Sequence, residues 1–485
     1  MKLLSPGSRS VRTLLLASAG VGCLSLGIAA RQAGNPNQWK LPDPGATPSS
    51  RASSRTVPRP DGAQLKLPAG FSASAYADNV ANARLMVYAP NGDLFVSQPA
   101  QNTILVLREA NGTVSREVFA QGTAPGARGG AGGGAAGAGG ARGGPGAGAG
   151  RGAPGGGGAG RGGAGGFGGG FGQGGNNFAA QGPARGGAAA APSNTPNSPF
   201  GLAFHNGYLY VGNWDAVIRY KYTNGDLKAQ GPAEVVAPVR DTRGNHYTTN
   251  VLINSAGTKM YVAVGSSGNN NETDDDRRAA VTEYNLDGTG KRTFGSGLRN
   301  PVGLAWQPGT NALWTAVNER DTYGDDLVPD YATSVKDGGF YGWPWSYLGQ
   351  NYDPAHVGKQ PEKVKSALVP DVWIPAHSAA LGLTFYTGTQ FPEHYRNGLF
   401  VALHGSWNRS KAQGYRVVFV PFQNGKPSGP LEDFMSGFIV DDGSGGGITT
   451  WGRPVGVTVA KDGSLLVSDD TGNQIYKVSY SAPRR

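Results

Sequence analysis

Charged and titratable side chains stand at the starts of several apolar, strand-like segments of this sequence. Arg299 comes just before one such segment, and because a guanidinium stays charged at any physiological pH, it needs an anionic partner near a protein core. When the segments are aligned by their turns, His246 falls at the position of Arg299. Arg84 and Arg453 fall within about one residue of that position, and His377 lies one residue away. A loop carboxylate is the simplest partner for a single arginine, but this recurrence favours one shared anion that carries several carboxylates.

The apolar segments belong to a repeat of two short strands joined by a turn that contains Gly or Asn. Six copies can be recognised, among them RLMVYAPNGDLFVS, VGLAWQPGTNALWTAV and VGVTVAKDGSLLVSDD. Period-two alternation, turn glycines and the lack of a long helical pattern predict an all-β chain. Six such units are most simply arranged as a six-bladed β-propeller, in which the N-terminal segment Gly70–Asp78 supplies the outer strand of the last blade. A pair of β-sandwiches is the alternative.

In a propeller the first strand of each blade lines the central channel, and its start shares a face with the end of the second strand. The five basic residues would therefore surround the mouth of one channel. Trp214, His404 and Trp407 follow second strands and are candidates for a substrate rim, because aromatic faces pack on the C–H surfaces of sugars. Packing within a loop explains Trp407 equally well.

The chain divides by composition into parts that fold and parts that do not. Residues 1–30 have the basic start, apolar middle and small-residue end of a signal peptide, which predicts a periplasmic or secreted protein without a membrane span. Residues 31–60 are predicted to be a flexible tether, and residues 61–483 the propeller, interrupted by a disordered Gly/Arg-rich insertion at 121–190. Cys23 is the only cysteine, so a disulfide or a thiol metal site is not expected in the mature chain.

The formal net charge of +10 does not indicate a nucleic-acid partner. The basic excess lies in residues 1–60, in the glycine-rich insertion and in the last two arginines, so the predicted propeller itself is acidic. The basic balance is therefore a property of the tails.

At the strand starts that carry Arg299, His377 and Arg453, the sequence resembles the soluble glucose and L-sorbosone dehydrogenase family. The motifs LRNPVGLAW and GGFYGWPWSY are typical of the wider family. AALGLTFYTGTQFP, HGSWNRSKAQGYRVVFVPF and GRPVGVTVAKDGSLLVSDD are closest to its sorbosone dehydrogenase-like branch. The resemblance spans residues 65–480 apart from the glycine-rich insertion. It implies a six-bladed propeller that uses pyrroloquinoline quinone (PQQ) together with Ca²⁺.

The resemblance also implies roles for individual residues. Arg299 and Asn300 would bind PQQ, and Arg453 would hold one of its carboxylates. The place of Arg84 and His377 in the alignment adds them to this cofactor set. His246 matches the catalytic base of the family. The backbone carbonyls of Asp321 and Thr322 match its Ca²⁺ ligands, and oxygen ligands suit this cation.

The chemistry implied is the oxidation of the C1 hydroxyl of an aldose, or of a hydrated sugar aldehyde such as sorbosone. Neutral His246 would take the hydroxyl proton as hydride leaves C1 for the quinone, and an external acceptor, a cytochrome or a quinone, would receive the electrons. The sequence departs from glucose-type members at Thr387, near which they carry Lys, and at Val455, where they carry Arg. Fewer charged contacts to PQQ are expected as a result.

Other functions are weighed against this one. A Ca²⁺-dependent lactonase-type hydrolase would need a cluster of Asp, Glu and Asn at the channel mouth, whereas this mouth is rich in Arg. A non-catalytic carbohydrate-binding propeller is the second alternative. The loop NNNETDDDRR, residues 269–278, is a further candidate for Ca²⁺, although a solvated loop is the simpler explanation.

Overall fold

The computed structural model of the protein describes residues 39–123, 191–240, 244–444 and 447–482. The predicted signal peptide and residues 124–190 of the predicted insertion lie outside the described residues. Within these ranges the chain is all-β, as predicted, and helical structure is confined to one helix and three 3₁₀ turns: α1 (Pro361–Ser366), η1 (Pro99–Gln101), η2 (Pro354–His356) and η3 (Glu393–Tyr395). No helix in the described ranges is long and apolar enough to cross a lipid bilayer.

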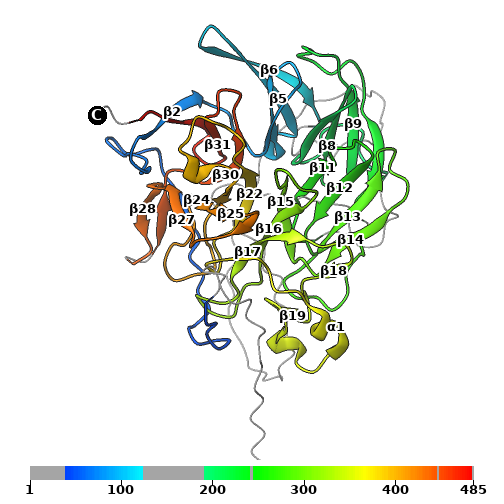
Figure 1. The fold of residues 1–485 in the computed structure, drawn as a ribbon, viewed down its shortest axis with the longest axis vertical. Coiled ribbons are helices and arrows are strands. Elements are labelled where there is room, and N and C mark those ends of the chain that lie inside the picture. The colour runs from blue at the N-terminus through cyan, green and yellow to red at the C-terminus, as the bar shows by residue number, and fades with distance from the viewer. Residues whose placement is uncertain (1–38, 124–190, 241–243, 445–446, 483–485) are drawn as a thin grey trace, which may run out of the picture. The chain divides into compact units, whose positions relative to one another are not determined.

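Six sheets in the described ranges share one plan, in which four antiparallel strands follow one another from a first to an outer strand (Figure 1). The first strands are β3 (Met86–Tyr88), β7 (Leu202–His205), β11 (Thr249–Ile253), β15 (Asn300–Trp306), β22 (Ala380–Phe385) and β30 (Pro454–Val459). The second strands are β4 (Leu94–Gln98), β8 (Tyr208–Gly212), β12 (Lys259–Val264), β16 (Leu313–Asn318), β23 (Leu399–Leu403) and β31 (Leu465–Asp469). The third strands are β5 (Thr103–Ala110), β9 (Ala216–Lys221), β13 (Ala280–Asn285), β17 (Asp330–Val335), β24 (Arg416–Val420) and β32 (Gln474–Tyr480). The outer strands are β6 (Thr113–Gln121), β10 (Glu234–Pro238), β14 (Arg292–Ser296), β21 (Val372–Ile374), β27 (Glu432–Met435) and β2 (Phe71–Ala77).

Shorter strands decorate these sheets. The strand β18 (Gly339–Phe340) pairs in parallel with β14. The remaining short strands are β1 (Arg55–Thr56), β28 (Ile439–Asp442) and β29 (Ile448–Thr450), the pair β19 (Ser346–Tyr347) and β20 (Asn351–Tyr352), and the pair β25 (Phe422–Gln423) and β26 (Lys426–Pro427).

The turns between first and second strands show why the repeat folds as hairpins. Between β30 and β31, Gly463 adopts a φ of +83°, which costs glycine little and other residues more. The Asp462 side chain accepts hydrogen bonds from the Ser464 backbone N–H at 3.0 Å and from its hydroxyl at 2.6 Å. The local sequence therefore reverses the chain between two runs of buried apolar residues.

Consecutive sheets pack face to face through separate clusters of buried apolar side chains. Representative pairs, from the contact of the first and second sheets onward, are Ile104 and Ile218, Val217 and Val262, Ala263 and Val317, Ala332 and Val401, Phe400 and Val467, and Leu466 and Val96. The last pair joins the sixth sheet to the first. Each first strand also contacts the first strand of the next sheet, and β30 contacts β3. The starts of the first strands are thereby brought to a common region.

The sixth sheet combines strands that are far apart in the sequence. β2 lies within the segment expected to supply its outer strand, and it pairs antiparallel with β32, Phe71 opposite Tyr480 and Ala77 opposite Ile475. Phe71 packs edge-on against Phe391 with ring centroids 4.7 Å apart. The pairing is therefore supported by apolar contacts as well as by the strand hydrogen bonds.

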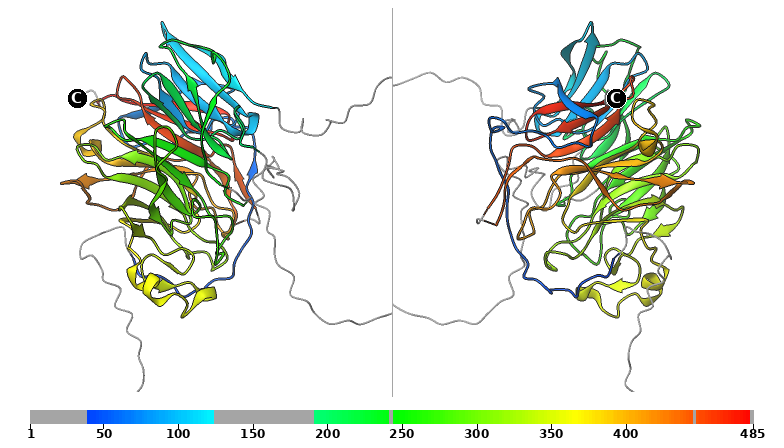
Figure 2. Two further views of the ribbon diagram at one scale, coloured as in Figure 1. Left: turned by 90° about the vertical axis from the view of Figure 1, so that its right-hand side faces the viewer. Right: turned by 60° about the vertical axis from the view of Figure 1, so that its left-hand side comes forward.

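Residues 39–57, which form part of the predicted tether, lie against the sheets, and we call them the N-terminal strap (dark blue in Figure 2). Trp39 packs edge-on against Trp373, with ring centroids 5.7 Å apart. The strand β1 pairs in parallel with β29. Composition predicted a free tether here because the strap docks largely through main-chain hydrogen bonds, which leave no pattern in the sequence.

Candidate functional site

Arg299, Asp321 and His377 form a buried cluster that we call the Arg299 triad. Arg299 precedes β15, Asp321 follows β16 and His377 precedes β22, so the hairpins bring all three to one face. Arg299 Nη2 lies 3.0 Å from Asp321 Oδ2, and Asp321 Oδ1 lies 3.4 Å from His377 Nδ1. His377 Nε2 donates to the Gly324 carbonyl at 2.8 Å. Burial lowers the pKa of His377, but the Asp321 carboxylate outweighs it and raises this pKa above its usual value.

Arg299 directs its remaining donors at local acceptors. Its Nε and Nη2 donate to the Asn269 carbonyl at 3.1 Å and to Asn269 Oδ1 at 2.9 Å, and its Nη1 donates to the Glu319 carbonyl at 2.5 Å. The sequence predicted three arginines turned toward one anion, without carboxylates of their own. In the structure Arg299 has its own carboxylate partner, because the loop after β16 folds back over it.

His246 is held in one tautomer. Its Nδ1 lies 2.8 Å from the Ser266 carbonyl, which can only accept, so Nδ1 carries the proton and Nε2 carries the lone pair. Burial, reinforced by the positive charge of Arg299, lowers the pKa of His246 well below its usual value. His246 is therefore a neutral imidazole at physiological pH, as a general base must be.

Asn300 lies beside His246 and has an unsatisfied acceptor. Its Oδ1 is buried and has no hydrogen-bond partner in the part of the chain that the structure describes. A Cβ on Gly265 would come within 2.2 Å of this oxygen and 2.6 Å of His246 Cβ, so only glycine allows the two side chains to lie this close. A ligand that donates a hydrogen bond, or a cation, would satisfy the amide oxygen.

At Asp321 and Thr322, the residues expected to bind Ca²⁺, the backbone carbonyls are the candidate ligands and the Asp321 carboxylate is not. The Asp321 carboxylate, which the sequence suggested as an extra ligand, is paired with Arg299 and His377. The Asp321 carbonyl accepts from Asn269 Nδ2 at 3.1 Å, and Thr322 is exposed with a φ of +82°. Across the described residues, no group of three or more His, Cys, Asp or Glu is arranged to hold a metal.

The acidic loop 269–278, the second candidate for Ca²⁺, directs its carboxylates at cations. Asp275 Oδ2 lies 2.6 Å from Arg277 Nη2, and Asp276 Oδ2 lies 2.6 Å from Lys291 Nζ. These ion pairs favour a solvated loop over a second Ca²⁺ site.

A second buried cluster, the Arg84 triad, consists of Arg84, Asp470 and His404. Arg84 Nη2 lies 2.6 Å from Asp470 Oδ2, and His404 Nε2 lies 2.9 Å from Asp470 Oδ1. Arg453 adjoins the triad and donates from Nε and Nη2 to the carbonyls of His404 and Gly405, both at 2.9 Å. Arg84 and Arg453 are therefore neighbours, whereas Arg299 belongs to the other triad.

Burial and the charges within and beside the Arg84 triad shift the pKa values of its histidine and its aspartate. Burial, together with the charges of Arg453 and Arg84, lowers the pKa of His404 to about 4. Burial raises the pKa of Asp470, but Arg84 and His404 outweigh it and hold this pKa well below its usual range. Arg84 Nε has no hydrogen-bond partner among the described residues, so one donor of this guanidinium remains for a ligand.

The three residues predicted to form a substrate rim differ in exposure and in their partners. His404 is 4% exposed and hydrogen-bonded to Asp470, so it is a buried member of a triad and not a rim residue. Trp214 and Trp407 are half-buried, and each stacks with an arginine: Arg240 lies 5.5 Å from the Trp214 ring and Arg51 of the strap 5.6 Å from the Trp407 ring.

Sequence reasoning gave no role to Asn408 or Asp470, and it considered Asn269 only as part of the loop 269–278. Each of the three follows the second strand of its unit, as Asp321 does. The rule that selected Trp214, His404 and Trp407 would have included them if it had been extended to every polar residue after a second strand.

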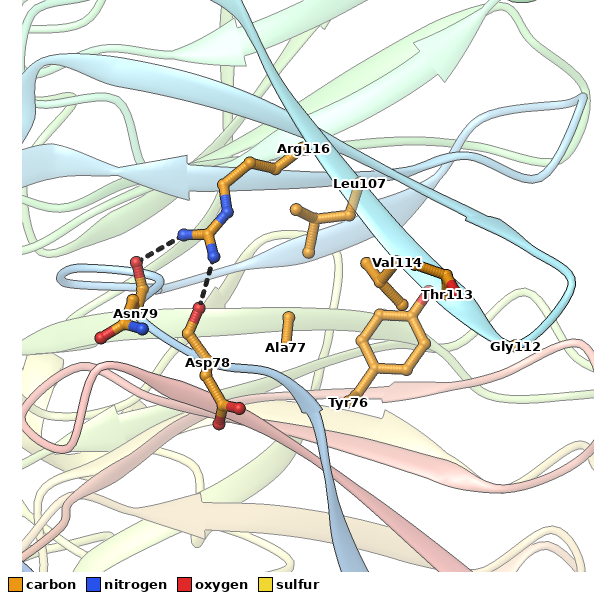
Figure 3. A pocket seen from close by; sticks show the side chains of 9 residues that line it. All are labelled: Tyr76, Ala77, Asp78, Asn79, Leu107, Gly112, Thr113, Val114 and Arg116. Carbon is orange, nitrogen blue, oxygen red and sulfur yellow. Dashed lines mark hydrogen bonds between the residues drawn. The ribbon is translucent and has the colours of Figure 1, made fainter.

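A separate pocket of about 450 Å³ lies between the edge of the sixth sheet and the outer hairpin of the first (Figure 3). Arg116 closes one side by donating to the carbonyls of Asn79 at 2.8 Å and Asp78 at 3.0 Å. None of the predicted site residues lines this pocket.

Comparison with family models relates two regions of the chain to sugar dehydrogenases. Residues 206–409 match the Glucose / Sorbosone dehydrogenase model, and residues 359–481 match the TrAA12-like model. Each model covers less than half of the chain.

Three relatives show sequence similarity. An uncharacterized protein of Borreliella burgdorferi is 28% identical over 303 residues, which cover 59% of this chain and 77% of that protein. A pyrroloquinoline quinone-dependent pyranose dehydrogenase of Coprinopsis cinerea is 36% identical over 124 residues, 23% of this chain and 16% of the enzyme. An aldose sugar dehydrogenase of Escherichia coli (strain K12) is 31% identical over 106 residues, 22% of this chain and 27% of the enzyme. The matches to the two enzymes span well under two thirds of their length.

Solved structures share the fold. The holo PQQ domain of the Coprinopsis cinerea pyranose dehydrogenase superposes with a TM-score of 0.61 at 19% identity, covering 88% of this chain and all of that one. A calcium structure of the Trichoderma reesei AA12 enzyme gives 0.59 at 18% identity, covering 89% and 100%. The PQQ-bound aldose sugar dehydrogenase of Streptomyces coelicolor gives 0.51 at 14% identity, covering 86% and 100%.

Proposed function

From its relationship to the PQQ-dependent sugar dehydrogenases, we propose that this protein is a PQQ-dependent oxidoreductase of an aldose C1 hydroxyl or of a hydrated, sorbosone-like sugar aldehyde. The observation that carries the proposal is the position of neutral His246 beside the buried, unpartnered oxygen of Asn300. A general base next to an unfilled binding group is what this oxidation requires.

We further propose that the six sheets are the blades of one closed propeller. Two features support this arrangement: the contact between β30 and β3, and the packing of the sixth sheet on the first. The two triads then lie at the mouth of a central channel, on the face where first strands start.

The cofactor set is proposed from donors and acceptors that the fold leaves for a ligand. Asn300, Arg84 and Arg453 would hold PQQ, with the Arg299 triad beside them, and the carbonyls of Asp321 and Thr322 would hold Ca²⁺. When bound, PQQ would supply the group that accepts a hydride and with it two electrons, and Ca²⁺ would polarise the accepting carbonyl.

His246 performs the proton transfer. Its Nε2 lone pair takes the proton of the C1 hydroxyl while a hydride leaves C1, so the substrate loses two electrons and two protons. The Ser266 carbonyl, by accepting from Nδ1, keeps the ring in this tautomer and orients it. An external cytochrome or quinone would then take the electrons, in the periplasm or outside the cell.

The test is dye reduction by the full chain supplied with PQQ and Ca²⁺, over a panel of aldoses and sugar aldehydes. His246→Asn should lower kcat by roughly 10²–10⁴-fold, because the base is lost. Since the pKa of His246 is lowered, the acid limb of kcat/KM should lie below pH 6.5. His394→Asn, at an exposed histidine paired with Glu432, is the matched control and should leave kcat unchanged.

No dye reduction with any substrate, together with an unchanged PQQ absorption spectrum, would overturn the proposal and favour a carbohydrate-binding role. Full activity of His246→Asn would instead remove His246 as the base.

A further inference from the structure

The N-terminal strap contacts the loop that carries the proposed cation ligands. The Gly45 backbone N–H donates to the Tyr323 carbonyl at 2.9 Å, and the Asp325 backbone N–H donates to Thr47 Oγ1 at 2.7 Å. A Cβ on Gly324 would come within 2.7 Å of the Thr47 carbonyl, so strap and loop are in direct contact. The strap thus lies against the outer side of residues 321–325.

Asn408 connects the strap to the same loop from a third segment. This residue is 2% exposed and follows β23. Its Oδ1 accepts from the Thr322 backbone N–H at 2.8 Å, and its Nδ2 donates to the Ser50 carbonyl at 2.5 Å and to Ser49 Oγ at 3.2 Å. One buried amide therefore fixes both the strap and the peptide group between the two proposed ligands.

The loop has a backbone conformation that needs such support. Thr322 has a φ of +82°, which is unfavourable for a β-branched residue and persists only where the surroundings hold it. On the inner side, Asn269 Oδ1 accepts from the Asp321 backbone N–H at 2.9 Å. On the outer side, Asn408 and the strap bond the backbone N–H of Thr322, the carbonyl of Tyr323 and the backbone N–H of Asp325. Further along the loop, His377 bonds the Gly324 carbonyl, and Arg409 and Ser410 bond Asp325. Among these contacts, the bond from Asn408 is the one made to Thr322 itself.

We propose that Asn408 and Thr47 are positioning residues, and that through them the N-terminal strap holds the carbonyls of Asp321 and Thr322 in place for a divalent cation. This inference rests on the proposed function, because that function assigns the cation to these carbonyls. Residues that orient metal ligands typically change metal affinity by roughly 10–100-fold when they are replaced.

The experiment is calorimetric titration of Ca²⁺ into the EDTA-treated full chain. Asn408→Ala should weaken Ca²⁺ binding by roughly 10–100-fold, and Thr47→Val, which removes one acceptor but keeps the shape, by a smaller factor. Thr47→Ser, which keeps the hydroxyl acceptor, should bind Ca²⁺ with the wild-type affinity. The matched control is Arg55→Ala, in an exposed position of β1, and should bind Ca²⁺ as the wild type does.

Hydrogen exchange of the Ca²⁺-free proteins measures the positioning itself. Amides in peptides covering 321–325 should exchange faster in Asn408→Ala and Thr47→Val than in the wild type and in Arg55→Ala. Unchanged exchange and affinity in both variants would overturn the inference while leaving the proposed function intact. A wild-type chain that binds no Ca²⁺ would overturn the assignment of the cation to Asp321 and Thr322, both in this inference and in the proposed function.

Discussion

Both triads consist of an arginine, an aspartate and a histidine linked in that order. The pKa values of their two histidines are nevertheless shifted in opposite directions. In each triad an aspartate lies between an arginine and a histidine, and no side chain of either triad is more than 12% exposed. The pKa of His377 is raised, whereas that of His404 is lowered to about 4.

The surroundings of each histidine explain the difference. Burial lowers the pKa of both histidines. At His377 the hydrogen bond and the charge of Asp321, together with the bond to the Gly324 carbonyl, outweigh burial, whereas at His404 the positive charge of Arg453 adds to burial. An Arg–Asp–His motif therefore does not define a protonation state, because burial and the neighbouring groups decide it.

Removing the aspartate should have the larger effect in the Arg84 triad. Asp470→Asn leaves the buried Arg84 without a carboxylate and should lower the free energy of unfolding by roughly 3–5 kcal/mol in urea denaturation. Asp321→Asn should lower it by roughly 2 kcal/mol, because Arg299 keeps its bonds to Asn269 and Glu319.

The matched control is Asp433→Asn, which breaks the exposed pair with Arg416 and should change stability by less than about 1 kcal/mol. An equal loss for the Asp470 and Asp321 variants would contradict the distinction between the triads.

The pH dependence of stability should have opposite signs at the two histidines. The folded state depresses the pKa of His404 to about 4, so the stability that it gives relative to His404→Gln is complete above pH 6.5 and is lost as pH falls. The loss should approach about 3 kcal/mol near pH 4. The folded state raises the pKa of His377, so its stabilisation is complete below pH 6.5 and is lost as pH rises through the folded pKa.

Urea denaturation of the wild type and of each His→Gln variant across this pH range checks both slopes. Slopes of the same sign would mean that the surroundings of the two histidines do not shift their pKa values in opposite directions.

The smallest expected effect is local. Arg453→Gln removes the positive charge beside His404, so the pKa of His404 should rise from about 4 toward its ordinary value. Imidazole ¹⁵N chemical shifts followed by NMR across pH report this change directly. Arg396→Gln, at an exposed arginine, is the control, and a His404 titration that stays the same in both variants would refute the role of Arg453.

The sequence predicted the hairpins and their common face, because alternating apolar residues and turn glycines such as Gly463 are local signals. It also predicted that Arg84, Arg299 and Arg453 lie at the starts of equivalent strands. It did not predict that Asp470 and Asp321 neutralise two of them, since the conformation of each loop decides which carboxylate turns inward. The docking of the strap was missed for a related reason, because its partners, both backbone groups and side chains such as Asn408, belong to loops and strands far away in the sequence.

The pairing of β2 with β32 has a consequence for biosynthesis. A ribosome makes β2 before nearly all of the rest of the described chain and β32 after it, so this sheet cannot be completed until β32 has been made. A product that stops before Gln474 would expose Phe71 and the free edge of β2 to other chains. Only a chain that includes β32 can bury this edge, so products that lack β32 present an unpaired strand that proteases can recognise.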